Sequence, residues 1–407
     1  TLACYSIALF SVTPALDAGS NDARWRAISY SHKYCLLKCN LFGLAPDAPA
    51  PHFMASSTST CARSNALGRV VESLSRARRS RARTVAPTRR ARAKASGSST
   101  MRMTSEQKFA FDLQGYCVVP GVFTDEEVEM MNAAIDARAD EIIERKGRLR
   151  LGGKAGDPLA GDGATGREDL GGMLSWENGD AEVFRSVLNH PTLVPYYHAL
   201  VGKGYRMDHL PLMIQQRTGA DGFVFHGGRM NPDGSWCQEL AYTCEGGTMY
   251  NQLIGVSVAL SDTEPGDGGF CILPGSHKSS FPCPQKILEY KDHHDLVVNP
   301  RLIAGDVLIF SEAATHGTLA WTAKHTRRAV LYRFAPPTSA YGRSYYPTWP
   351  QGTEEGMTDA QKAVLQPPHH VRLDRTTLTD SGTVAGTQTR DDFKMDHDAK
   401  VFGNKYF

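Results

Sequence analysis

The chain has 407 residues, of which 41% are hydrophobic and 22% charged, and its formal net charge is +2. This composition is ordinary for a globular protein and excludes collagen-like, coiled-coil and wholly disordered chains. The length suits one large domain with extensions, or two domains. No run of about 18 apolar residues occurs, so we expect no membrane span. The nine Cys are scattered without a CxxC pair, which argues against a disulfide framework and against a structural zinc site.

Charge is distributed unevenly along the chain. Residues 54–104 contain 11 Arg and one Lys against a single acid, whereas residues 105–407 carry a net charge of −10. The stretch that begins at Met54 is rich in Arg and Ser and poor in acids, which is typical of an organellar transit peptide. We therefore expect residues 1–104 to be a targeting or disordered segment that directs import into a plastid or mitochondrion, with a cytoplasmic location as the alternative.

The same basic segment could instead be a tail that binds nucleic acid. No aromatic residue lies between Met54 and Thr104, so stacking of aromatic side chains on bases has no support in this segment. We accordingly expect no nucleic-acid partner, and a small-molecule substrate instead.

The folded domain is predicted to begin near Ser105. Thr124 and Glu127 have the spacing of a capping box, and the helix that follows is expected to bury a periodic set of apolar residues: Val128, Met131, Ile135 and Ile142. Residues 147–172 are rich in Gly and polar residues without phosphate-loop spacing, so we expect a mobile loop or lid. One or two further helices are expected over residues 181–201.

From residue 204 onward, short β-branched and aromatic runs alternate with Gly, Pro and Asp turns. The predicted strands are 212–216, 222–225, 253–260, 269–273, 307–310 and 329–334. This pattern favours a mainly β sandwich or barrel, flanked by the helices that precede it. Residues 351–407 are predicted to form a polar, loop-like C-terminal extension.

Three polar side chains occur at the ends of predicted strands. His226 ends the strand over 222–225, His316 follows the strand over 307–310, and Arg327 opens the next one. In a jelly-roll barrel these three side chains can converge. Two imidazoles with open positions suit Fe(II), and a guanidinium offers a fork for a carboxylate.

In this order, the pieces resemble the phytanoyl-CoA dioxygenase family of iron- and 2-oxoglutarate-dependent oxygenases. The resemblance spans about residues 105–340 and rests on DLQGYCVVPGVFTDEEV at 112–128, HxG at His226, ALSDTEPGDGGFCILPGSHK at 259–278, AGDVLIF before His316, and the spacing to Arg327. It implies a double-stranded β-helix, or jelly roll, within a domain over 105–350. It also implies that His226 and His316 are iron ligands, that Arg327 pairs with the distal carboxylate of 2-oxoglutarate, and that Thr318 assists Arg327.

One position departs from the family pattern. The family has a carboxylate ligand two residues after the first His, where this chain has Gly228. Another acid could supply the oxygen ligand: Glu312 is nearest in sequence to a ligand, and the further candidates are Asp221, Asp233 and Glu239. Alternatively, chloride could fill the open position, because related halogenases have Ala or Gly there. In a third alternative, iron is held weakly or not at all.

These alternatives correspond to three functions. The first is hydroxylation of a C–H bond of a small organic substrate by a non-haem dioxygenase that uses Fe(II), 2-oxoglutarate and O2. The second is a 2-oxoglutarate-dependent halogenase with chloride facing Gly228, and the third is a non-catalytic binding protein of the same fold. Trp176 and Arg229 could line the substrate pocket, whereas His277 is expected to belong to a structural turn.

Overall fold

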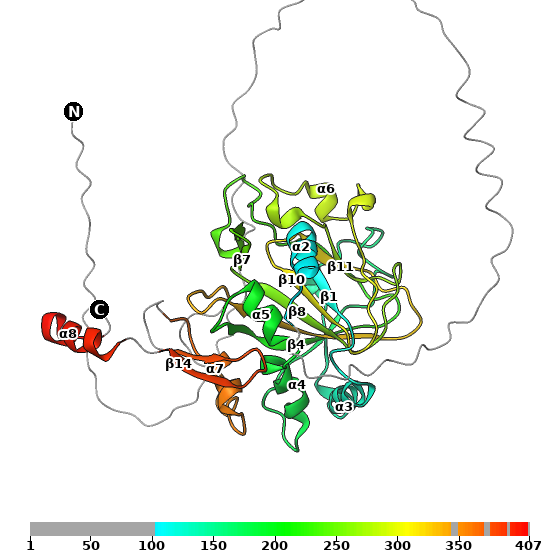
Figure 1. Cartoon of the computed structure of the whole chain (residues 1–407). Coiled ribbons are helices and arrows are strands. Elements are labelled where there is room, and N and C mark those ends of the chain that lie inside the picture. Colours follow the sequence, from blue (N-terminus) through cyan, green and yellow to red (C-terminus); the bar gives the residue numbers. More distant parts are fainter. Residues whose placement is uncertain (1–101, 343–348, 370–374, 389–390, 406–407) are drawn as a thin grey trace, which may run out of the picture. The chain divides into compact units, whose positions relative to one another are not determined.

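The computed structural model describes residues 102–342, 349–369, 375–388 and 391–405, all within one compact unit, Ala93–Phe407 (Figure 1). The transit peptide expected from Met54 lies outside the described residues. Within them, no helix is both long and apolar enough to cross a membrane.

Two capped helices precede most of the β structure. Helix α2 spans Ser105–Gln114 and helix α3 spans Asp125–Asp136; each begins with a complete capping box, on Thr104 and Thr124 respectively. As predicted, α3 buries Val128, Met131 and Ile135. The helix does not continue to Ile142, however. The helix ends at Asp136, and the guanidinium of Arg138 donates to Ala134 O and to Asp180 Oδ2. Ile142 has extended backbone and packs against the same core from there.

The core consists of two antiparallel sheets that face each other. The seven-stranded sheet has the order β1-β10-β8-β12-β4-β3-β2 and the three-stranded sheet has the order β5-β11-β9. The strands of the larger sheet are β1 Tyr116–Val119, β2 Ile143–Glu144, β3 Glu168–Leu170, β4 Arg206–Gln216, β8 Ile254–Ala259, β10 Val307–Ser311 and β12 Arg327–Ala335. Those of the smaller sheet are β5 Phe223–His226, β9 Gly269–Ile272 and β11 His316–Leu319. The predicted double-stranded β-helix is confirmed.

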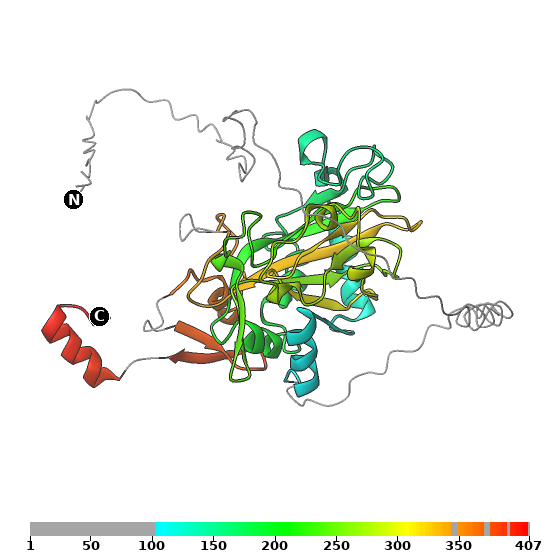
Figure 2. The same ribbon diagram turned by 90° about the horizontal axis from the view of Figure 1, so that it is seen from above.

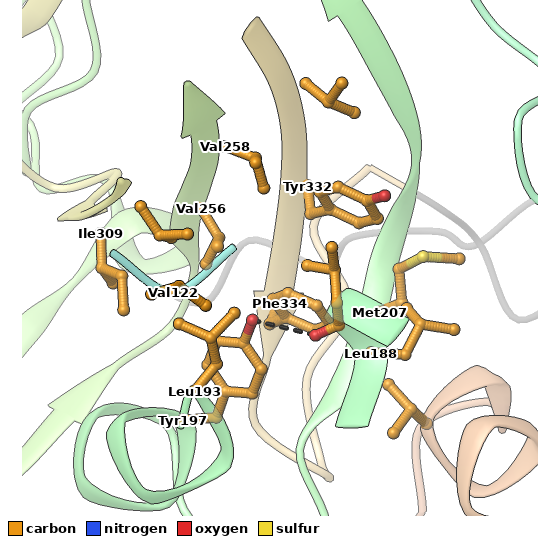
Figure 3. Close-up of a cluster of buried hydrophobic side chains, with 14 of the residues drawn as sticks. Val122, Leu188, Leu193, Tyr197, Met207, Val256, Val258, Ile309, Tyr332 and Phe334 are labelled. Carbon is orange, nitrogen blue, oxygen red and sulfur yellow. Dashed lines mark hydrogen bonds between the residues drawn. The ribbon is translucent and has the colours of Figure 1, made fainter. Parts of the chain in front are cut away.

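Strand β12 shows how alternation separates the two faces of the large sheet. On one face Val330, Tyr332 and Phe334 are fully buried in the main hydrophobic core, against helices α4 (Asp180–Asn189) and α5 (Val194–Leu200). Figures 2 and 3 show this helix-covered side and its packed side chains. The opposite face of β12 presents Leu331 to a second cluster, which includes side chains of β9 and β10, so this face looks into the space between the sheets.

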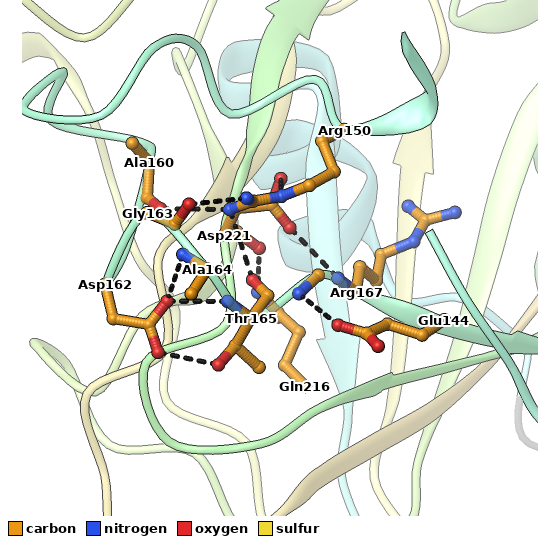
Figure 4. Close-up of polar contacts among 11 residues, drawn as sticks. Glu144, Arg150, Ala160, Asp162, Gly163, Ala164, Thr165, Arg167, Gln216 and Asp221 are labelled. Carbon is orange, nitrogen blue, oxygen red and sulfur yellow. Dashed lines mark hydrogen bonds and ion pairs between the residues drawn. The ribbon is translucent and has the colours of Figure 1, made fainter. Parts of the chain in front are cut away.

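The glycine-rich segment over 147–172 is largely a loop, which contains a short 3-10 turn at Gly147–Leu149 and ends with strand β3. The guanidinium of Arg150 donates to the backbone oxygens of Gly163 at 2.7 Å and Thr165 at 3.3 Å (Figure 4). The carboxylate of Asp162 accepts from the backbone N–H groups of Ala164 and Thr165. Side-chain hydrogen bonds to the backbone, which composition alone does not reveal, therefore organise this loop.

The remaining elements lie in the second half of the unit. They are the hairpin β6 Tyr242–Glu245 and β7 Thr248–Asn251, helix α6 Gln285–Leu288, helix α7 Asp359–Leu365, the hairpin β13 Arg375–Leu378 and β14 Val384–Gln388, and helix α8 Asp392–Phe402. Helix α7 differs from the polar, loop-like extension expected there. Its Ala363, Val364 and Leu365 belong to the main core, because a short amphipathic helix can bury one apolar face even within a polar stretch.

The aromatic centre of the main core supports a stability prediction. Phe334 is fully buried and lies 4.5 Å, ring to ring, from Tyr197. Phe334→Ala should lower the free energy of unfolding by about 3–5 kcal/mol, because it removes apolar contacts and leaves a cavity. The same substitution at Phe109, which is 70% exposed, should change it by less than about 0.5 kcal/mol. Urea unfolding of both variants checks this; equal losses would contradict the assignment of the core.

Candidate metal and cosubstrate site

His226 and His316 lie opposite each other in the small sheet. They are register partners in the antiparallel pair β5–β11, and their ring centroids are 4.4 Å apart. The register shifts between His316 and Thr318, so that Thr318 pairs with Phe223. Such an irregularity resembles a β-bulge, which changes the direction of nearby side chains. It lies beside the pair of histidines, which are 90 residues apart in the sequence.

The hydrogen bonds of both imidazoles leave the same nitrogen free. His226 Nδ1 lies 3.1 Å from Val224 O, and His316 Nδ1 lies 2.8 Å from Ala314 O. A carbonyl oxygen can only accept, so Nδ1 carries the hydrogen in each ring and Nε2 keeps its lone pair. This is the tautomer that metal-binding histidines adopt when a backbone carbonyl orients them.

Both rings are held in the neutral form that metal binding requires. Burial lowers the pKa of His316, although the nearby Glu312 carboxylate opposes the shift. His226 lines a pocket and is exposed to it. The protein atoms around the ring still exclude part of the water, and this desolvation, together with the adjacent His316, lowers the pKa of His226 as well. Neither imidazole therefore needs to lose a proton near neutral pH before it can bind a cation.

Glu312 lies next to the two histidines. It follows β10 directly and is 5% exposed; its Oε2 is 3.5 Å from His316 Nε2, and its Oε1 accepts from Arg333 Nε at 2.7 Å. Burial works against ionisation of this carboxyl, but the Arg333 guanidinium, together with the two histidines once low pH protonates them, holds its pKa at about 2. Glu312 is thus an ionised carboxylate that faces the free nitrogen of one histidine and is ion-paired on its other side.

The structure does not gather a complete ligand set around one point. Among the described residues, no group of three or more His, Cys, Asp or Glu side chains is arranged to hold a metal ion. The other acids considered as ligands are engaged elsewhere: Asp221 contacts Arg150 and the backbone of Arg167, and Asp233 caps a turn at Ser235. Glu239 lies beside Cys237.

Two consecutive glycines after His226 differ in the space beside them. Both have positive φ, +80° at Gly227 and +94° at Gly228. A Cβ at Gly227 would come within 2.6 Å of Ala314 O and 2.7 Å of Glu312 O, which are backbone atoms that cannot move aside. A Cβ at Gly228 would have one neighbour within 4 Å, Thr315 Oγ1 at 3.3 Å. The position where the family has its carboxylate is therefore open.

Arg327 faces the interior from the first residue of β12. It is 5% exposed, and its Nη1 donates to Gln216 Oε1 at 3.1 Å. No ion pair joins it to a carboxylate of the described residues. Burial and the nearby Arg167 lower the pKa of Arg327 to about 10, which leaves it cationic at neutral pH. A buried guanidinium without an anionic partner suits an anionic ligand.

Arg328 lies on the opposite face, as the alternation along the strand predicts. Its guanidinium pairs with Asp136 of α3 at 2.7 Å and donates to Gln215 Oε1. Thr318 is half-buried on β11, two residues after His316 and opposite Phe270 of β9. The side chain of Arg327 in turn reaches β9, since a Cβ at Gly269 would lie 2.6 Å from its Nε. Thr318 and Arg327 therefore flank the same strand.

A second layer of residues supports Arg327 and was missed from the sequence. Gln216 is fully buried and donates its Nε2 to Asp221 O and Leu319 O. The Asp221 carboxylate is held by Arg150 and by the backbone N–H of Arg167, as Figure 4 shows. Arg333 was also missed, although its position six residues after Arg327 on an alternating strand places both on one face. The hydrogen bonds that connect Gln216 through Asp221 with Arg150 have no comparable pattern in the sequence.

A cavity of about 490 Å³ opens beside His226. His226, Gly228, Arg229 and Thr315 line it, together with apolar side chains that include Phe225, Leu273 and Ile287. Arg229, one of the two residues considered for a substrate pocket, thus lines this cavity. Trp176 does not line this cavity and packs against Phe184 and Arg138 instead. His277 is fully buried and bonds to Asp112 O, in keeping with the structural role expected of it.

Solved structures with a similar fold were found. HygX from Streptomyces hygroscopicus, with nickel and 2-oxoglutarate bound, is 21% identical, with a TM-score of 0.47 over 59% of this chain and 90% of that chain. The epimerase SnoN from nogalamycin biosynthesis is 18% identical, with a TM-score of 0.41 over 65% of this chain and 94% of that one. Similarity at this level carries no argument about ligands or reaction. No curated protein matches the chain.

The family comparison is more direct. The model of the phytanoyl-CoA dioxygenase (PhyH) family matches residues 111–329, which is more than half of the chain. The matched region contains both histidines, Gly228, Glu312 and Arg327, on the double-stranded β-helix described above. The chain therefore belongs to the phytanoyl-CoA dioxygenase family.

Proposed function

We propose that this protein is an Fe(II)- and 2-oxoglutarate-dependent oxygenase that uses O2 to hydroxylate a C–H bond of a small organic substrate. One observation carries the proposal: two neutral imidazoles whose Nε2 atoms keep their lone pairs and a buried guanidinium without a carboxylate partner occur in the same β-helix core. A metal cation and a dicarboxylate are the ligands that these groups suit.

Each group has a distinct part in this proposal. His226 and His316 would hold the iron, and Glu312 is the nearest carboxylate that could complete the site. When bound, iron would supply the activation of oxygen, which the side chains cannot perform themselves. Arg327, oriented by Gln216 and assisted by Thr318, would bind the distal carboxylate of 2-oxoglutarate.

The surroundings of His316 would keep water from the reacting atoms. The rings of Phe310 and Phe270 lie 4.7 and 6.0 Å from its ring centroid. The cavity of about 490 Å³ reaches His226 and would receive the substrate beside the metal. Apolar walls of this kind exclude bulk water and strengthen the electrostatic interactions inside the site.

A specific observation supports a second candidate function. The space beside Gly228 is open apart from Thr315 Oγ1, so a small anion could occupy the place of the missing carboxylate. With chloride there, the protein would be a 2-oxoglutarate-dependent halogenase that transfers the halide to its substrate. Glu312 and chloride are therefore alternative candidates for the third ligand of the metal.

The role of Arg327 is tested by the binding of 2-oxoglutarate. Arg327→Ala should weaken this binding by at least about tenfold, because a charge-assisted hydrogen bond to a carboxylate is lost. Arg328→Ala is the matched control, since Arg328 has its own partners on the outer face, and it should bind nearly as the parent does. Calorimetric titration with 2-oxoglutarate, in the presence of Fe(II) and under argon, measures the dissociation constant of each variant. Equal affinities in the two variants would remove the assignment.

The role of Glu312 is tested by the binding of iron. Glu312→Gln keeps the side-chain volume and an acceptor for Arg333 but removes the negative charge, so Fe(II) affinity should fall by at least about tenfold. Glu264→Gln, at an exposed ion pair with Arg301, is the control and should leave iron binding unchanged. Anaerobic equilibrium dialysis with metal analysis gives the constants. Parental iron binding in Glu312→Gln would leave two protein ligands and favour the halide at Gly228.

Turnover in the presence and absence of chloride separates the two candidate functions. The oxygenase should form succinate from 2-oxoglutarate at a rate that does not depend on chloride. A chloride-dependent change in the iron-linked absorption, with a chlorinated product, would establish the halogenase instead. Folded protein that binds no iron at all would overturn both and leave a non-catalytic binding protein.

If chlorination occurs, Gly228→Asp should end it, because the carboxylate would take the site of the halide. The positive φ makes any side chain there cost about 1–2 kcal/mol of strain. Gly234→Asp is the matched control for that strain, since Gly234 also has positive φ, +83°, with no atom within 4 Å of an added Cβ. Chlorination that persists in Gly228→Asp would exclude this position as the halide site.

A further inference from the structure

The cavity beside His226 contains a single side chain with a permanent charge. Of the residues that line it, only Arg229 is an arginine, lysine, aspartate or glutamate, and most of the others are apolar or glycine. The apolar set includes Phe225, Leu273, Ile287 and Leu288. Phe281, also in the lining, is 80% exposed, so the open side of the cavity presents an apolar ring to solvent.

The two serine side chains of the lining already have partners. Ser276 Oγ donates to Leu273 O at 2.6 Å and accepts from Thr315 N at 2.7 Å. Ser279 Oγ donates to Phe281 O at 3.0 Å. These hydroxyls organise the loop that carries them, so they are poorly available to a ligand.

Arg229 differs from these hydroxyls. Its Nε is buried and has no hydrogen-bond partner, and no ion pair connects its guanidinium to a carboxylate of the described residues. Only its backbone oxygen is bonded, to Cys237 N at 2.8 Å. A polar atom that is removed from water without a partner is unfavourable, and an anion in the cavity would offset this cost by pairing with the guanidinium.

We propose that this cavity binds a substrate with an apolar body and an anionic group, either a carboxylate or a phosphate monoester, and that Arg229 pairs with that group. A guanidinium matches both anions through parallel hydrogen bonds. The apolar body lies against Phe225, Leu273 and Ile287. This inference rests on the proposed function, since it names the substrate class of the same site, and it makes Arg229 a residue that determines specificity.

The test compares three probes with one apolar body: octanoate, octyl phosphate and 1-octanol. Their binding to the folded protein without metal and 2-oxoglutarate is measured by calorimetry, below the concentration at which they form micelles. We expect at least one anion to bind about tenfold or more tightly than octanol, because hydrogen bonds to charged groups contribute at least that much. The anion that binds more tightly identifies the head group.

The variants show whether Arg229 causes the preference. Arg229→Gln should abolish the preference for the anion and leave octanol binding unchanged, whereas Arg229→Lys should retain part of it. Lys286→Gln is the control, since it removes an exposed positive charge from α6 without touching the cavity lining, and it should behave as the parent. Circular dichroism establishes that each variant is folded.

Two results would overturn the proposal. One is that neither anion binds the parent more tightly than octanol, whether or not octanol binds. The other is that Arg229→Gln keeps the full preference, or that Lys286→Gln loses it equally. Because iron and 2-oxoglutarate are absent from these titrations, failure of the proposed oxygenase chemistry would appear in the iron and cosubstrate measurements and not here.

Discussion

The pairing of β5 with β11 is the constraint on which the site depends. Their register places His226 opposite His316, and a slip of one residue would turn a histidine to the other face of the sheet. On that other face, Phe225 and Cys271 pack in a separate apolar cluster. The hydrophobic residues of these strands therefore fix the register, and the register in turn brings together two ring nitrogens with free lone pairs. The ability of the two imidazoles to bind one ligand therefore depends on the packing of the apolar side chains on these strands.

The charge inside the β-helix is opposite in sign to the net charge of the domain as a whole. The chain from residue 105 carries a net negative charge, yet Arg167, Arg327 and Arg333 lie close enough in the β-helix to influence one another. Two carboxylates, Asp169 and Glu312, neutralise only part of this charge. A low-dielectric interior strengthens the remaining positive potential, so an anionic ligand would be drawn inward although residues 105–407 together carry a net negative charge.

Much of this arrangement could be predicted from the sequence. The six β-rich runs and the capping box at Thr124 match observed elements, because periodicity and capping are local signals. His226, His316 and Arg327 were proposed as site residues from their order and spacing at the strand ends, and the structure places all three on strands of the β-helix. Ile142 was assigned to a helix wrongly, since a buried apolar residue at helical spacing can also come from an extended segment that reaches the same core.

Other features depend on contacts that no local pattern encodes. The ion pair of Glu312 with Arg333 joins a turn to a strand whose pairing with β4 is irregular near Arg333. The links from Gln216 through Asp221 to Arg150 connect a strand with a loop far away in sequence. The pairing of Gln216 with Arg327 is likewise between strands that are more than a hundred residues apart. Tertiary structure must be known before such residues can be connected with the site.

The path of β12 has a consequence for how the limits of this domain are drawn. The family match ends at residue 329, whereas the strand continues to Ala335 in the middle of the large sheet. A fragment that ended with the match would lose Tyr332 and Phe334 from the core and Arg333 from the site. It would also lose α7, whose Val364 and Leu365 share that core. The matched segment is thus shorter than the segment that packs around one core, and a boundary for recombinant expression belongs after α7.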